Sequence, residues 1–213
     1  MTTTTRAPAA RLLVPLTLLL AGLTCFIMLL VPKAERTHAF DTAGHPTLGS
    51  PAARAEIVLF VDYQCPACRA FETSVLPRVE QDLVRTGQAR VVTLQSPFIG
   101  PDSRTAANAA LCAYRQGNAA FWRLNAALFA QQGDERTHWA TPAVLREVAA
   151  AQGLDRRAFD ACLTSGNTDA QVQADLDQHT RAGFQGTPAV FVNGVRSAPG
   201  LAAIRAAVEH ARP

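Results

Sequence analysis

Two cysteines with two residues between them are the clearest candidates for chemistry in this chain. Cys65 and Cys68 enclose Pro66 and Ala67 and follow directly on an apolar, β-branched run. Pro66 suits the first turn of a helix, because its missing N–H is not needed there and its fixed φ is helical. We therefore expect Cys65 at a helix N-terminus, where unpaired backbone N–H groups and the helix dipole stabilise a thiolate. The pair, with Pro66 and Ala67 as its support, predicts a dithiol/disulfide redox centre or, alternatively, a metal-binding pair.

Strand and helix patterns surround this cysteine pair. Residues 57–61 predict a buried strand, and residues 67–86 carry apolar side chains at helical spacing, with a kink expected at Pro77. Residues 90–96 then predict a second strand. Because the connection between the two strands is long and helical, we expect them to be parallel neighbours.

The stretch from residue 102 to residue 183 differs in composition, since Ala, Leu, Gln and Arg dominate and no strand pattern appears. Helices are predicted in this block over residues 103–116, 118–132, 142–152, 155–164 and 168–182. The sheet pattern then resumes, because Thr187 and Pro188 open a short apolar strand that ends in an Asn-Gly turn. A last helix is predicted over residues 201–211. The fold class is therefore α/β, with an all-helical insertion at about 103–183.

An uncharged run of twenty residues, Leu12–Val31, is long enough to cross a bilayer as a helix. Arg6 and Arg11 precede it, so the positive-inside rule places residues 1–11 in the cytoplasm and the rest of the chain outside. We expect one N-terminal transmembrane helix, with a cleaved signal peptide as the alternative. Cys25, inside this run, lies in a poor lipobox and is expected to be inert.

Residues 32–50 are rich in Pro, Gly, Thr and His without periodicity, and they predict a linker to a domain over residues 51–213. His38 and His45 are expected to be solvated residues of this linker. The other histidines, at positions 138, 179 and 210, have no metal-ligand spacing, so we assign them no chemistry and expect neither a metal nor another cofactor.

The net charge of +3 comes from the N-terminal segment. Without Arg6, Arg11 and Lys33, 17 basic residues face 17 acidic ones, and the remaining part of the chain is neutral. No basic cluster appears, which excludes a nucleic-acid-binding protein.

Three parts of the sequence together resemble the DsbA-like branch of the thioredoxin superfamily. They are the Asp62-Tyr63-Gln64-Cys65-Pro66-Ala67-Cys68 run, the helical block, and the Gly186-Thr187-Pro188 unit before Phe191-Val192-Asn193-Gly194. The resemblance extends from about residue 48 to the C-terminus and implies a thioredoxin-like fold with a central mixed sheet. It also implies a cis Thr187–Pro188 bond that lies against the cysteine pair. Gln64 replaces the Trp of many thioredoxins, and Ala67 replaces the His of the best-known DsbA proteins, which removes one stabiliser of the thiolate.

The resemblance implies a role for each residue of the site. Cys65 would form the mixed disulfide with a substrate, and Cys68, one turn on and buried, would resolve it. Thr187 and Pro188 would line the groove for an extended substrate. Asp62 is left with two equal readings, as a proton acceptor near Cys68 or as a turn or cap residue.

Cys112 and Cys162 are the remaining cysteines of the domain, and both fall in the helical block. In an exported domain we favour a structural disulfide between them over two buried thiols. A closed loop of this length would stabilise the fold by about 4 kcal/mol on the chain-entropy model.

These observations predict a membrane-tethered thiol:disulfide oxidoreductase that introduces disulfides into exported proteins. The chain would be a monomer anchored by a single pass in the cell membrane, with its catalytic domain on the extracytoplasmic side. The resemblance implies a membrane partner of the DsbB or VKOR type that restores the disulfide. A reductase or isomerase, a metal-binding chaperone and a non-enzymatic anchored binding domain are the alternatives.

Overall fold

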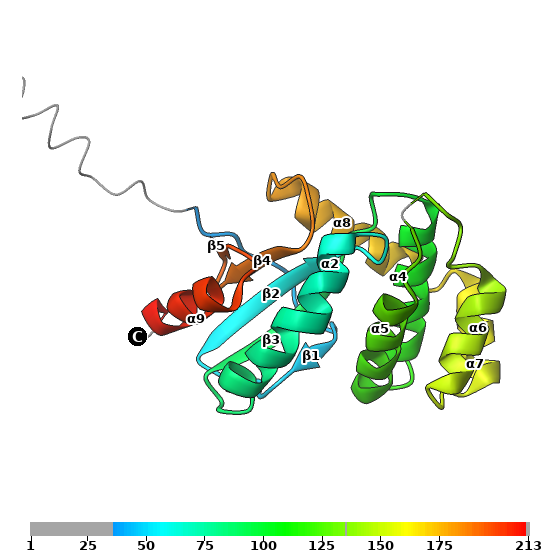
Figure 1. Ribbon diagram of the computed structural model, residues 1–213, viewed down its shortest axis with the longest axis horizontal. Coiled ribbons are helices and arrows are strands. Elements are labelled where there is room, and N and C mark those ends of the chain that lie inside the picture. Colours follow the sequence, from blue (N-terminus) through cyan, green and yellow to red (C-terminus); the bar gives the residue numbers. More distant parts are fainter. Residues whose placement is uncertain (1–35, 135, 212–213) are drawn as a thin grey trace, which may run out of the picture. The chain divides into compact units, whose positions relative to one another are not determined.

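Five strands form the mixed sheet of the computed structural model, which describes residues 36–134 and 136–211 (Figure 1). In chain order they are β1 (Thr47–Leu48), β2 (Ala55–Val61), β3 (Ala89–Gln95), β4 (Ala189–Val192) and β5 (Val195–Ser197). Their spatial order is β1-β3-β2-β4-β5. β2 and β3 are parallel, as expected from the helical connection, and the other three pairings are antiparallel.

The helices occupy the predicted ranges, with ends shifted by one or two residues at most. They are α2 (Pro66–Ala70), η2 (Phe71–Val75), α3 (Leu76–Val79), η3 (Glu80–Val84), α4 (Pro101–Tyr114), α5 (Asn118–Gln131), α6 (Pro142–Ala151), α7 (Arg156–Ser165), α8 (Asp169–Arg181) and α9 (Leu201–His210). The block from α4 to α8 is the helical insertion. A thioredoxin-like sheet with an all-helical insertion is therefore confirmed.

The helix that follows Cys65 continues from Pro66 to Val84 and alternates α and π turns. The Leu76 N–H donates to the Phe71 carbonyl, five residues back and directly before Pro77. Pro77 has no N–H to donate, and the wider turn beside it lets the helix continue. Where the sequence predicted a kink at Pro77, the structure has π turns on both sides of the short α3 segment that contains it.

Each face of the sheet has its own apolar layer, because alternate residues of β2 point to opposite sides. One layer joins Ile57 and Leu59 to the helix after Cys65, to α9 and to the insertion. The second contains Val58 and Phe60 and packs against Phe40. Figure 1 shows the helix after Cys65 crossing one face of the sheet, with α4 to α7 gathered to one side. The N-terminal end of this helix lies beside the insertion.

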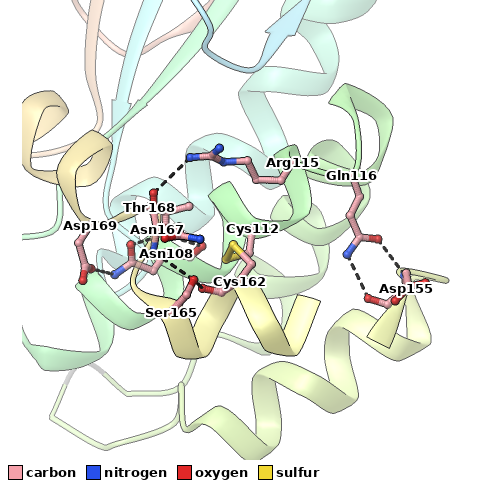
Figure 2. Close-up of a disulfide and its surroundings, with 10 residues drawn as sticks. All are labelled: Asn108, Cys112, Arg115, Gln116, Asp155, Cys162, Ser165, Asn167, Thr168 and Asp169. Atoms are coloured by element: carbon pink, nitrogen blue, oxygen red, sulfur yellow. Dashed lines mark hydrogen bonds between the residues drawn. A yellow bond between two sulfur atoms is a disulfide. The ribbon is translucent and has the colours of Figure 1, made fainter. Parts of the chain in front are cut away.

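A disulfide joins two helices of the insertion. Cys112 in α4 and Cys162 in α7 are bonded with an S–S distance of 2.07 Å, which is the pairing that we expected. Figure 2 shows polar contacts beside it, where the Asp155 N–H donates to Gln116 Oε1 at 2.8 Å and Gln116 Nε2 donates to the Asp155 carbonyl at 3.1 Å. The ends of α4 and α7 are thus held by one covalent bond and by side chains around it.

The expected linker over residues 32–50 is wrong for its described part. Thr47 pairs with Val92 in the sheet, and His45 is only 8% exposed. His45 Nε2 lies 2.7 Å from Asp175 Oδ1, so this histidine is an anchor and not a solvated residue. A two-residue strand is too short to show a periodic pattern, which is why composition alone predicted a linker.

The structure leaves the proposed anchor untested. No helix within residues 36–134 and 136–211 is long and apolar enough to cross a membrane. The run Leu12–Val31, together with Cys25 and residues 1–11, lies outside the described residues, and its assignment stays a prediction.

Candidate active site

Cys65 lies where the chain passes from β2 into α2, and its sulfur contacts the Thr187 segment. It is the N-cap of α2, with extended dihedrals of φ −80° and ψ 116°, and its carbonyl accepts the Arg69 N–H at 3.2 Å. Its side chain is 7% exposed, and the thiol donates to the Thr187 carbonyl at 3.1 Å. The sequence-based placement of Cys65 at a helix N-terminus is therefore confirmed.

Cys68 lies one turn further along and is fully buried, with 0% exposure. Its sulfur accepts a hydrogen bond from the Asp62 N–H at 3.4 Å. Both Cys65 and Cys68 are free thiols in this structure. Both residues are buried, but Cys65 keeps a small accessible area and Cys68 has none.

The two thiols have opposite acidities. A hydrogen bond from the Cys68 thiol is the main cause that lowers the pKa of Cys65 to about 6, and the N–H groups of Cys68 and Ala67 add to it against the opposing effect of burial. Burial raises the pKa of Cys68 far above the ordinary thiol range, and the neighbouring Cys65 sulfur raises it further. In the reduced pair the proton therefore stays on Cys68, and Cys65 carries the negative charge at neutral pH.

The Thr187–Pro188 segment lies against this sulfur pair. The Thr187–Pro188 peptide bond is cis, as the resemblance implied. The Thr187 side chain lowers the pKa of both thiols. The fold thus brings together two segments that lie more than a hundred residues apart in the sequence.

Asp62 acts as a turn residue. Its Oδ1 accepts the Gln64 N–H at 2.8 Å, and its Oδ2 accepts the N–H groups of Phe98 at 3.0 Å and Ile99 at 3.1 Å. The carboxylate is 1% exposed and satisfied by these three backbone donors. Of the two readings left open, the structure favours the turn, and the contact between Asp62 and Cys68 is made by the Asp62 backbone.

Two glutamines that support the site were missed in the sequence. Gln132 Nε2 donates to the carbonyls of Tyr63 at 2.7 Å and Cys65 at 3.0 Å. Gln64 Oε1 accepts the Ser103 N–H at 2.9 Å. Both tie the cysteine turn to the helical insertion, and no local pattern predicts contacts between residues so far apart along the chain.

A buried polar group beneath the site was also missed. The Tyr63 hydroxyl donates to Asn125 Oδ1 at 2.7 Å, and Asn125 Nδ2 donates to Glu72 Oε2 at 2.9 Å. Burial raises the pKa of Glu72 to about 7, and its Oε1 is buried without a partner among the described residues. Glu72 occurs within an otherwise ordinary helical pattern, so nothing in the sequence sets it apart.

The histidines do not form a metal centre with other side chains in the part of the chain that the structure describes, where no cluster of three potential ligands occurs. His138 and His210 are exposed. His179 is 3% exposed and lies at the opposite side of β3 from the helix that carries Cys68. A metal-binding chaperone would need a third ligand beside the cysteine pair, and none is found within residues 36–134 and 136–211.

Comparisons with known proteins agree with this geometry. The family model described as Thioredoxin matches residues 41–210. "Disulfide bond formation protein D" of Bacillus subtilis is 29% identical over 160 residues, which are 70% of this chain and 68% of that protein. "Probable disulfide bond formation protein D" of Bacillus anthracis is 27% identical over 194 residues, 90% of this chain and 89% of that protein.

Solved structures give the same result. The crystal structure of oxidised BdbD from Bacillus subtilis superposes with a TM-score of 0.77 and 25% identity, covering 84% of this chain and 98% of that one. The family model matches most of the chain, and the relatives are named for disulfide bond formation. The thiol pair at the start of a helix, with one lowered and one raised pKa, agrees with this. This chain therefore belongs to the thioredoxin family as a DsbA-like protein disulfide oxidoreductase.

Proposed function

We propose that this oxidoreductase works as an exported oxidase, which is tethered to the membrane and introduces disulfides into secreted or envelope proteins through Cys65-Pro66-Ala67-Cys68. The proposal rests on the opposite pKa shifts of the two thiols. The pKa of Cys65 is lowered to about 6, and that of Cys68 is raised by burial. A stable Cys65 thiolate stabilises the reduced pair, and a stabilised reduced form makes the disulfide a stronger oxidant.

The reaction begins with the Cys65–Cys68 disulfide. A substrate thiolate attacks the Cys65 sulfur, the bond between the two cysteines breaks, and its electron pair leaves on Cys68, which takes up a proton. The second substrate thiolate then attacks the substrate sulfur of the mixed disulfide, and Cys65 leaves as a thiolate. The substrate dithiol loses two electrons and the cysteine pair gains them. Cys65 is the better leaving group because thiols of low pKa leave faster.

A substrate reaches Cys65 along the Thr187–Pro188 segment in this proposal. The Thr187 carbonyl lies 3.1 Å from the Cys65 sulfur, so an extended peptide bound to this segment would place its own sulfur beside Cys65. Phe98, which is 47% exposed and attached through its N–H to Asp62, offers an apolar contact at the rim. Thr187 and Pro188 thus form the groove, and Phe98 extends it.

Export and tethering rest on the uncharged run Leu12–Val31 and on Arg6 and Arg11 before it. The Cys112–Cys162 disulfide supports an oxidising compartment, since such bonds persist outside the cytoplasm. An oxidase must be returned to its disulfide form after each turnover. A membrane partner of the DsbB or VKOR type, which accepts two electrons from the reduced pair, would do this.

Replacement of Cys65 tests the proposal. The Cys65→Ser variant should lose catalysed oxidation of a reduced model protein, leaving the uncatalysed rate, because serine cannot form the mixed disulfide. The Cys68→Ser variant has no Cys65–Cys68 disulfide and should also lose this oxidation. Its free Cys65 thiolate should instead attack a substrate disulfide and remain in a mixed disulfide, visible under non-reducing electrophoresis, because no Cys68 thiol is present to release it. Oxidation at an undiminished rate by Cys65→Ser would refute the assignment of the site.

The direction of electron flow needs a second measurement. The equilibrium of the wild-type pair with glutathione gives its reduction potential, and we expect a value well above the potential of thioredoxin, which is about −270 mV. A value near that of thioredoxin would favour the reductase alternative.

A further inference from the structure

His179 lies in α8 and is buried at the end of β3, where the mechanism above gives it no task. Its Nδ1 lies 2.8 Å from the Ser96 hydroxyl. The imidazole packs between two aromatic rings, with centroid distances of 5.3 Å to Phe60 and 5.8 Å to Phe98, and its plane is within 18° of the Phe98 ring. The side chain is therefore held on several sides by specific contacts.

The second ring nitrogen of His179 is less well satisfied. Nε2 is buried and has no hydrogen-bond partner among the described residues. Buried polar atoms without a partner are uncommon and costly in native proteins, so a hydrophobic residue would be the simpler choice for this position. We therefore infer that the polar ring at this position does more than fill the core.

The segment that supports Cys68 meets this imidazole. Phe98, which stacks on His179, donates its N–H to the Asp62 carboxylate, and the Asp62 N–H in turn donates to the Cys68 sulfur. Ser96, which bonds Nδ1, donates its own N–H to the Val61 carbonyl at 2.8 Å, directly before Asp62. One side chain thus contacts both residues that hold the Asp62 support of Cys68.

We propose that His179 is a positioning residue for the redox pair, which holds Ser96 and Phe98 in place against the Asp62 turn. It thereby fixes the position of the Cys68 thiol, which stabilises the Cys65 thiolate. The inference rests on the proposed function of the same cysteine pair. His179 touches neither sulfur and takes no part in the exchange itself.

The charge state of His179 fits a positioning role. Burial lowers its pKa, and the positive charge of Arg196 lowers it further. Asp175, one turn earlier in α8, is occupied by His45 and by the Gln95 N–H and does not pair with His179. The imidazole is therefore neutral at pH 7, and its effect on Cys65 comes from geometry and not from a nearby charge.

Two variants and a matched control test the proposal. His179→Phe keeps a ring of similar size and removes both nitrogens, whereas His179→Asn retains a polar atom near the position of Nδ1. His210→Phe makes the same change at an exposed site at the end of α9. For each full-length protein, the equilibrium constant with glutathione, the Cys65 thiolate absorbance against pH and the urea unfolding curve would be measured.

His179→Phe should change the glutathione equilibrium constant by about threefold to tenfold, which is about 15–30 mV for this two-electron couple. Its thiolate titration should move to higher pH, because a displaced Cys68 thiol donates a weaker hydrogen bond to Cys65. His179→Asn should lie closer to the wild type, and His210→Phe should match it. A purely structural role would alter only the unfolding curve, and an unchanged equilibrium constant in His179→Phe would overturn the proposal.

If His179→Phe does not fold, Ser96→Ala provides the answer, because it removes only the hydroxyl that bonds Nδ1. The same direction of shift is expected, and no shift would count against a positioning role. The glutathione equilibrium is a property of the cysteine pair alone. A failure of the oxidase proposal would appear in the absolute potential of the wild-type pair or in the client assay with Cys65→Ser. The role of His179 depends only on the difference between variant and wild type.

Discussion

The two cysteine pairs of the described domain differ in spacing and in redox state. Cys65 and Cys68 are three positions apart at the start of a helix, and the structure holds them reduced. Cys112 and Cys162 are 50 positions apart, on two different helices, and are bonded. The first pair has backbone N–H donors and the Thr187 segment around it, whereas the second bridges packed helices of the insertion.

The difference shows what separates a redox centre from a structural crosslink. Stabilisation of one reduced sulfur makes the first disulfide easy to reduce, because the thiolate of Cys65 is a good leaving group. The second pair belongs to the apolar core, and Figure 2 shows polar contacts around it, among them those of Gln116 with Asp155. Its closure of a long loop instead removes entropy from the unfolded chain. Position in the fold, and not cysteine chemistry as such, assigns the two roles.

The largest expected effect comes from deleting the structural bond. The double variant Cys112→Ala with Cys162→Ala should lower the free energy of unfolding by about 4 kcal/mol, since a loop of 50 residues is no longer closed. Urea denaturation of wild type and variant, both with the redox pair reduced, measures the difference.

The redox pair should survive this deletion. Below its unfolding temperature the double variant should keep the glutathione equilibrium constant of the wild type, because the Cys65 environment does not include the crosslink. A large change in that constant, with the domain still folded, would contradict the separation of roles between the two pairs.

The next effect is a pH dependence confined to the first pair. The folded pKa of Cys65, about 6, lies below its value in the unfolded chain, about 8.5. The thiolate therefore stabilises the reduced protein fully above about pH 8.5, and this contribution is lost as the pH falls through about 6. We expect the stability of the reduced form to rise with pH across this window relative to the oxidised form, with a slope of at most about 1.4 kcal/mol per pH unit.

Unfolding of the two forms at pH 5 and pH 8 measures this difference. Taking it between reduced and oxidised forms cancels groups that titrate in both, among them Glu72 and His45. The Cys65→Ser variant forms no Cys65–Cys68 disulfide, so it is compared with the reduced wild type and should gain less stability between pH 5 and pH 8. The bonded Cys112 and Cys162 do not titrate and contribute nothing. Equal pH profiles for reduced and oxidised wild type would show that the Cys65 thiolate is not stabilised.

The smallest of these effects concerns the turn under the redox pair. Asp62→Asn should lower the free energy of unfolding by about 2 kcal/mol, because an amide group replaces one of the carboxylate oxygens that accept three backbone N–H bonds. Asp177→Asn, at an exposed site in α8, is the matched control and should be close to neutral.

Catalytic assays distinguish the two readings of Asp62. As a turn residue, Asp62 should affect stability more than the rate of substrate oxidation at neutral pH. A fall in rate of about a hundredfold or more without loss of stability would instead indicate a proton acceptor for Cys68.

Local patterns in the sequence determined much of this protein. The β-branched run before Cys65 predicted β2, Pro66 predicted the helix start, and the Asn-Gly turn predicted the β4–β5 hairpin. These elements depend on interactions between residues close together in the chain, so their signals are visible in the order of the residues. The cysteine spacing and the Thr187-Pro188 unit likewise identified the site.

Only the tertiary structure decided the surroundings of the two sulfurs. Gln132, His179 and the Asp62 carboxylate act through hydrogen bonds and ring contacts that join residues far apart in sequence. His45, expected in a solvated linker, became a buried partner of Asp175 for the same reason. Burial and the direction of a hydrogen bond depend on which segments meet in space. The sequence therefore determined which thiols could do chemistry, and packing between distant segments decided which of the two carries the charge.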